Sequence, residues 1–73
     1  MSVLQTEENN LSDRELEVLE LIAHGCKNHE IAMALEIKVR TVRFHVGNIL
    51  NKLKARNRTE AASYAFRNGW ITE

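Results

Sequence analysis

The chain has few of the residues that interrupt helices or cross-link small folds. Its 73 residues include no proline, three glycines and a single cysteine. The lack of proline favours uninterrupted helices, and one cysteine excludes an internal disulfide. No apolar run approaches the roughly 20 residues that a membrane span needs, and the polar, acidic residues 1–10 are unlike a secretory or transit peptide. We therefore expect one small domain in the cytoplasm, with no membrane contact.

The formal net charge is also zero, but the charged residues are unevenly distributed. Residues 1–36 hold eight acidic and two basic side chains and carry −6, whereas residues 37–73 hold eight basic and two acidic ones and carry +6. Such asymmetry is a hint of a surface that faces a polyanion. Acidic and basic surfaces that only keep the protein soluble would show the same pattern, so charge alone does not decide.

The spacing of apolar residues predicts four helices after a flexible arm of residues 1–10. Ser12 and Glu15 form a capping box at the start of the first helix, and Gly25 can take the left-handed conformation that ends it. The apolar face of this helix is expected to comprise Leu16, Leu19, Ile22 and Ala23, widened by Val18 and Leu21.

The next two helices follow in close succession. A short helix covers about residues 28–35, a tight connection follows, and a longer helix covers about residues 39–54. A short helix, a turn and a longer helix with a polar outer face form the helix-turn-helix pattern. The fourth helix begins at the cap residue Asn57, with Glu60 three residues on, and ends near Gly69.

The third helix carries the most informative pattern. Its apolar residues fall on a single stripe that consists of Val39, Val42, Val46, Ile49, Leu50 and Leu53. Phe44 points away from this stripe, in the company of Arg40 and Gly47, with Arg43 at the border. An exposed aromatic ring among arginines suits the major groove of DNA, where phenylalanine contacts thymine methyl groups and arginine bonds guanine. The alternative is that Phe44 packs against the arm and that the arginines are solvated.

The order and spacing of many residues resemble the LuxR/FixJ/GerE-type DNA-binding domain. The resemblance rests on Leu11-Ser12-x-Arg14-Glu15-x-Glu17-Val18-Leu19, Glu30-Ile31-Ala32, Leu35, Thr41-Val42-Arg43-x-His45-Val46-x-Asn48-Ile49, Lys52-Leu53 and Asn57-Arg58-Thr59-Glu60-Ala61. It implies an all-α, four-helix LuxR-type helix-turn-helix domain over residues 11–73, whose third helix enters the major groove. It also implies a homodimer that binds an inverted-repeat site on double-stranded DNA and is joined through the fourth helix.

The resemblance also implies roles for individual residues. The base-facing positions are occupied by Arg40, Arg43, Phe44 and Gly47. The positions suited to phosphate contact or to bracing the recognition helix are occupied by Thr41, His45, Lys52 and Arg58. Ala62 and Phe66 match the dimer face, and a second apolar patch on a small domain points the same way. The alternative is that Trp70 and Ile71 fold back over Phe66.

Two features depart from the family pattern. Lys27 and Lys38 stand where the family commonly has a serine or threonine cap. Lysine cannot accept an N–H hydrogen bond, so the start of each of these two helices lacks about 0.5–2 kcal/mol of stabilisation by capping. We expect both ammonium groups to lie close to DNA, which would repay part of that cost. Gly47 stands where a larger side chain is common; it either lets the helix sit deeper in the groove or lowers base discrimination.

His24, Cys26 and His29 lie within six residues of one another but do not predict a metal site. Zinc sites usually take four ligands, and no second pair is present; we expect neither a metal nor a cofactor. Cys26 lies near a helix start, a position that favours thiol reactivity, and is a candidate for redox sensing. The favoured alternative is that it is a small apolar filler.

The expected function is therefore a sequence-specific, DNA-binding transcription regulator. An enzyme is not expected, because no nucleophile, base and orienting group can be assembled. The alternative is an interaction module of the same fold that docks a regulatory protein partner through its acidic first half. The chain is either a stand-alone regulator or an output module of a longer one, and the Met start with a short arm favours the first.

Overall fold

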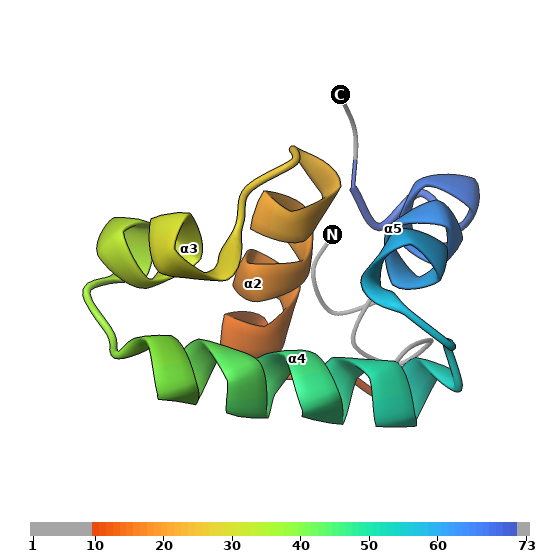
Figure 1. The fold of residues 1–73 in the computed structure, drawn as a ribbon. Helices are drawn as coiled ribbons and strands as arrows, with labels where there is room; N and C mark the ends of the chain where they lie inside the picture. Colours follow the sequence, from red (N-terminus) through yellow and green to blue (C-terminus); the bar gives the residue numbers. More distant parts are fainter. Residues whose placement is uncertain (1–9, 72–73) are drawn as a thin grey trace.

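The computed structural model describes residues 10–71, which form four helices and no strand. The helices are α2 (Asp13–Ala23), α3 (Asn28–Leu35), α4 (Val39–Leu53) and α5 (Arg58–Arg67). The predicted all-α class is confirmed, whereas the predicted arm lies outside the described residues except for its last position. Figure 1 shows α4 along one side of the molecule, with α2, α3 and α5 together on the other side. Each of these three helices packs against α4.

Hydrogen bonds at the helix starts follow the predicted caps in part. The Glu15 N–H donates to Ser12 Oγ at 3.1 Å and the Ser12 N–H donates to Glu15 Oε1 at 2.9 Å, which confirms the capping box. At α5, the Glu60 N–H donates to Asn57 Oδ1 at 2.8 Å. Arg56 offers two donors to the Glu60 carboxylate. Its N–H lies at 2.6 Å from that carboxylate and its guanidinium at 3.3 Å.

A left-handed backbone position follows each of the four helices. Gly25 follows α2 with a φ of +89°, as predicted. Glu36 and Lys54 end α3 and α4 with φ of +59° and +55°, although neither is a glycine. α5 ends at Arg67, near Gly69 as predicted, and Gly69 follows the cap residue Asn68 with a φ of +72°.

The core draws on all four helices and on the segments that flank them. The buried apolar side chains are Leu11, Val18, Leu19, Ile22, Ile31, Ala32, Val42, Ile49, Ala61, Ala65 and Ile71. Leu11 and Ile71 show that both ends of the described range fold onto the helices. No helix within residues 10–71 has the length and apolar character needed to span a bilayer.

All six residues predicted for the apolar face of α2 lie in the core or pack against it, but the most deeply buried ones are not all among the four predicted to define that face. Val18 is fully buried, whereas Leu16 and Ala23, which were predicted to define that face, are only half-buried. Glu15 is also buried, at 5% exposure. The physical reason is that α2 packs against both α4 and α5, so its buried face is set by two neighbours together.

Candidate nucleic-acid interface

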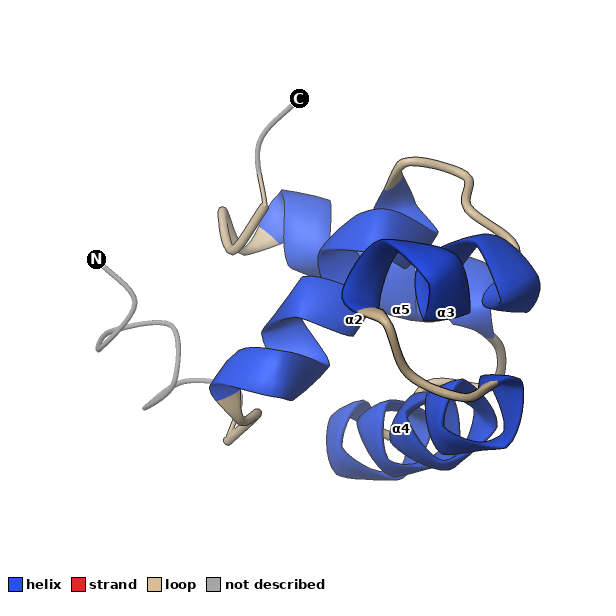
Figure 2. Cartoon of the chain, turned by 90° about the vertical axis from the view of Figure 1, so that its left-hand side faces the viewer, coloured by secondary structure: helices blue, strands red, loops and turns tan. Residues whose placement is uncertain are grey.

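The outward side of α4 is a continuous surface that no other described helix covers. Val42 and Ile49 are completely buried, and the other apolar residues of the predicted stripe pack against the core while partly exposed. Because a helix turns by about 100° per residue, Phe44 lies nearly opposite these two anchors. Phe44 is 66% exposed. Figures 1 and 2 show from two directions that the neighbouring helices lie on one side of α4 only.

The four residues predicted to face bases gather on this surface. Arg40, Arg43, Phe44 and Gly47 are all exposed. The Phe44 ring lies 6.0 Å from the His45 ring, centroid to centroid, with an interplanar angle of 59°. The alternative partner of Phe44, the arm, lies outside the described residues. The structure therefore brings the predicted base-facing side chains together on the free side of α4.

Thr41 and His45 lie on one flank of α4, between the core and the outward side. Both are half-buried, and their spacing from Lys52 places all three along the same flank. His45 Nδ1 is buried and has no hydrogen-bond partner among the described residues. A phosphate contact by this flank stays a prediction.

Lys52 has an internal partner. Its Nζ lies 2.8 Å from Glu15 Oε1, and this ion pair joins the start of α2 to the last turn of α4. Burial alone would raise the pKa of Glu15, but hydrogen bonds from the Lys52 ammonium and the Ser12 N–H outweigh it and lower the pKa below 4.5. Sequence reasoning assigned Glu15 only to the cap. Its spacing from Val18, Leu19 and Ile22 was the available signal that it shares their buried face.

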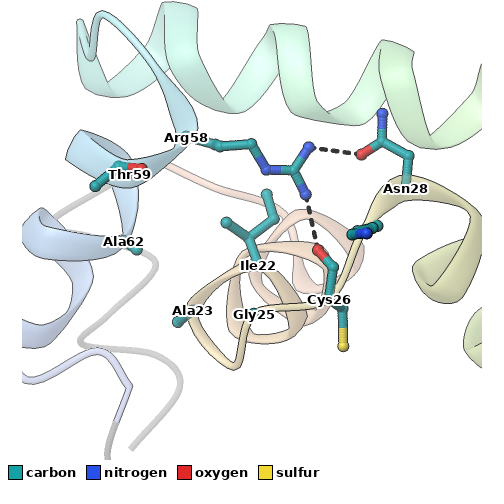
Figure 3. Close-up of a pocket in the computed structure, with 9 residues that line it drawn as sticks. Ile22, Ala23, Gly25, Cys26, Asn28, Arg58, Thr59 and Ala62 are labelled. Carbon is teal, nitrogen blue, oxygen red and sulfur yellow. Dashed lines mark hydrogen bonds between the residues drawn. The ribbon is translucent and has the colours of Figure 1, made fainter.

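Arg58 also has internal partners, which Figure 3 shows. Its Nη1 donates to Asn28 Oδ1 at 2.7 Å and its Nη2 donates to the Cys26 carbonyl at 2.9 Å. These bonds tie the first residue of α5 to the start of α3. The sequence did not point to these two acceptors. One of them is a backbone carbonyl, a group that every residue carries.

The remaining cations near α4 form no ion pair with another described residue. Lys27, Lys38, Arg40, Arg43 and Lys54 are exposed. The ion pairs among the described side chains involve other basic residues, namely Arg14, Lys52 and Arg56. Lys27 and Lys38 make no capping bond with their side chains, as expected, although Glu30 accepts the Lys27 N–H at 2.7 Å. Cations without an ion pair among the described residues therefore lie on the outward side of α4, at its C-terminal end and at the starts of α3 and α4.

The predicted dimer face lies on α5, away from α4. Ala62 is half-buried and Phe66 is 38% exposed. Ile71 is buried and Trp70 is half-buried, so the chain does fold back after α5 as the alternative required. Phe66 nevertheless keeps part of its ring exposed, and its role stays a prediction.

A hollow of about 620 Å³ lies between the end of α2 and the first turns of α5. It is lined by Ile22, Ala23, Gly25, Cys26, Lys27, Asn28, Arg58, Thr59 and Ala62. The Cys26 thiol is free and half-buried, and its side chain points away from Arg58 in Figure 3. Within the described residues, no three His, Cys, Asp or Glu side chains are grouped so as to hold a metal ion.

Comparison with known proteins gives consistent matches. Residues 9–65 match the family model of the bacterial regulatory proteins of the luxR family. The chain is 51% identical over 61 residues to the response regulator protein VraR of Staphylococcus aureus (strain NCTC 8325 / PS 47), and equally so to proteins of that name from Staphylococcus saprophyticus and Staphylococcus epidermidis. The matched region covers 84% of this chain but only 29% of each of these curated relatives.

Proposed function

Since this chain belongs to the luxR family of bacterial regulatory proteins, whose helix-turn-helix domain binds DNA, we propose that it regulates transcription by binding an inverted-repeat promoter site as a dimer. The observation that carries the proposal is the outward side of α4, where an exposed aromatic ring stands among unpaired arginines. Such a surface fits the major groove, which admits a single α-helix and offers both methyl groups and hydrogen-bond acceptors. The protein would act in the cytoplasm.

Different residues make the base contacts and the phosphate contacts. Arg40, Arg43, Phe44 and Gly47 face the base edges. The unpaired cations Lys27 and Lys38, with Thr41 and His45 on the flank of α4, contact phosphates. Lys52 and Arg58 instead hold the helices in place, because both already have partners within the fold.

The proposed homodimer is joined through α5. Phe66 supplies exposed apolar area on that helix, with Ala62 one turn before it. A two-fold interface uses the same patch on both copies. Two recognition helices placed in this way would read half-sites about 34–36 Å apart, which is one turn of B-DNA.

Selection of bound sequences from a random duplex pool tests this function. The expected result is a two-fold symmetric motif, and Arg43→Ala is expected to relax the preference at one base pair in each half-site, with a loss of about 1–3 kcal/mol. Recovery of sequences without any common motif would contradict the proposal. A motif without two-fold symmetry would contradict the dimer alone.

The replacement Lys38→Ser tests the phosphate contacts. It is expected to raise the free energy of unfolding by about 1 kcal/mol, because serine can cap α4. It is also expected to reduce the slope of log affinity against log salt concentration by about 1, because one phosphate contact is lost. Urea denaturation and DNA titrations at several salt concentrations measure the two effects. Arg14→Ser, on α2, is the control that should leave the slope unchanged; a slope equally unchanged in Lys38→Ser would place Lys38 away from the phosphates.

A protein partner is the second candidate, and one observation favours it. Asp13, Glu17 and Glu20 lie on one exposed stripe of α2, on a different helix from the basic surface of α4. A basic partner could dock there and regulate the domain without occupying the DNA-binding side. Weak DNA binding that is indifferent to sequence would favour docking as the main function.

A further inference from the structure

The hollow between the end of α2 and the first turns of α5 is separate from the outward side of α4. Its volume of about 620 Å³ lies within the range of about 300–1,000 Å³ that is typical of sites for small molecules. The end of α2, the turn that follows it, the start of α3 and the first turns of α5 form its walls, and α4 contributes none of the described residues that line it. A ligand of this hollow would therefore not compete directly for the outward side of α4.

The lining of the hollow combines apolar and cationic groups. Ile22 is buried, and Ala23 and Ala62 are half-buried, so these three side chains supply an apolar wall. Lys27 and Arg58 supply two positive charges, and none of the described residues that line the hollow is acidic. Figure 3 shows the Arg58 guanidinium directed toward α3, with Ala23 and Ala62 on the side away from it. Charge complementarity therefore favours an occupant that has both an anionic group and an apolar body.

Arg58 keeps hydrogen-bond donors for such an occupant. A guanidinium carries five N–H groups, and the bonds to Asn28 Oδ1 and to the Cys26 carbonyl use two of them, which leaves three. The same two bonds hold the guanidinium in place, so that less side-chain freedom is lost when a ligand binds. Arg58 is half-buried. A fixed and partly desolvated guanidinium is suited to charge-assisted hydrogen bonds with carboxylate or phosphate oxygens.

We propose that this hollow binds a small organic anion, whose charged oxygens contact Arg58 and Lys27 and whose apolar body lies against Ile22, Ala23 and Ala62. The ligand class is thus a carboxylate or phosphate group on a short hydrocarbon or aromatic body. This binding goes beyond the proposed function and does not depend on it, because it requires no contact between α4 and DNA.

Phenyl phosphate is the probe, since it joins a phosphate group to an aromatic ring. It is titrated into the isotope-labelled protein at constant ionic strength, and binding is followed by NMR spectroscopy. We expect the signals of Gly25, Arg58 and Ala62 to shift, with a dissociation constant of about a few millimolar for a ligand of this size. Inorganic phosphate has only the charge and benzyl alcohol only the ring, so each is expected to bind about fivefold more weakly or worse.

Three variants complete the test. Lys27→Gln removes one charge from an exposed side chain and is expected to weaken phenyl phosphate binding by up to about fivefold. Lys54→Gln is the matched control, because Lys54 is also exposed and without an ion pair to a described residue but does not line the hollow; its affinity should be unchanged. Ala62→Leu places a larger side chain on the apolar wall and should weaken binding, while the dispersion of the amide signals shows that the variant is folded.

The outcomes decide the inference independently of the proposed function. If phenyl phosphate shifts none of the signals of the lining residues, the hollow is not a site for an organic anion. Inorganic phosphate that binds as tightly as phenyl phosphate would overturn the role of the apolar wall and with it the proposed ligand class. Equal weakening by Lys27→Gln and Lys54→Gln would show attraction to general positive charge and would also overturn the inference. Selection of a duplex motif is unaffected by any of these results.

Discussion

Shortening Ile49 to alanine is expected to lower the free energy of unfolding by about 2–5 kcal/mol. Ile49 is completely buried and anchors α4 in the core, so the change removes apolar contacts and leaves a cavity. In a domain of this size, each kcal/mol lowers the thermal midpoint by about 4–8 °C. Thermal and urea denaturation followed by circular dichroism measure the loss.

Two variants serve as controls for Ile49→Ala. Ile49→Val removes a single methylene group and should cost only about 0.5–1.5 kcal/mol. Phe44→Ala, on the opposite side of the same helix, should change stability by no more than about 0.5 kcal/mol, because the ring is largely exposed. If Phe44→Ala were as destabilising as Ile49→Ala, Phe44 would belong to the core and the assignment of the outward side would be wrong.

Replacing Lys52 by methionine is expected to cost about 1–3 kcal/mol at neutral pH. The change leaves the Glu15 carboxylate, with 6% of its side chain exposed, without its cation. The Lys52 side chain is itself 35% exposed, so solvent screening reduces the loss below that of a fully buried pair. A double-mutant cycle with Glu15→Gln isolates the interaction from the separate effect of each replacement.

The contribution of this ion pair depends on pH in a defined direction. The pKa of Glu15 is lowered below 4.5 in the folded protein. Between the folded pKa and pH 4.5, the unfolded chain therefore binds more protons at this residue than the folded protein does. The stabilisation is therefore present above pH 4.5 and is lost as the pH falls through the folded pKa. Urea denaturation between pH 3 and pH 7 should show a steeper acid loss in the unaltered protein than in the Glu15→Gln, Lys52→Met double variant. Parallel profiles would show that the pair adds no stability.

Much of the fold could be predicted from local signals. The helix starts at Ser12 and Asn57 follow from side chains that bond to the backbone three residues on. The buried side of α4 follows from its 3.6-residue period, and this period also places Phe44 on the opposite side. Local hydrogen bonds and periodicity are properties of short segments, so a single sequence contains them.

Tertiary partners could not be predicted in the same way. Glu15 and Lys52 are 37 residues apart, and Arg58 bonds to a carbonyl 32 residues before it. A basic residue that neutralises a phosphate and one that braces a helix have the same side chain. The two roles differ only in whether an acceptor within the fold lies within hydrogen-bond distance of the basic side chain. That distance depends on how the helices pack.

The bonds made by Arg58 bear on how two copies would be spaced on DNA. Because this side chain joins α5 to the start of α3, and α3 packs on α4, a rotation of α5 would move α4 as well. In a dimer joined at α5, the two copies of α4 could therefore not adjust to a different distance between the half-sites. One inserted base pair shifts a half-site by about 3.4 Å and turns it by about 34–36°. Promoters read by such a pair would keep a constant number of base pairs between their half-sites.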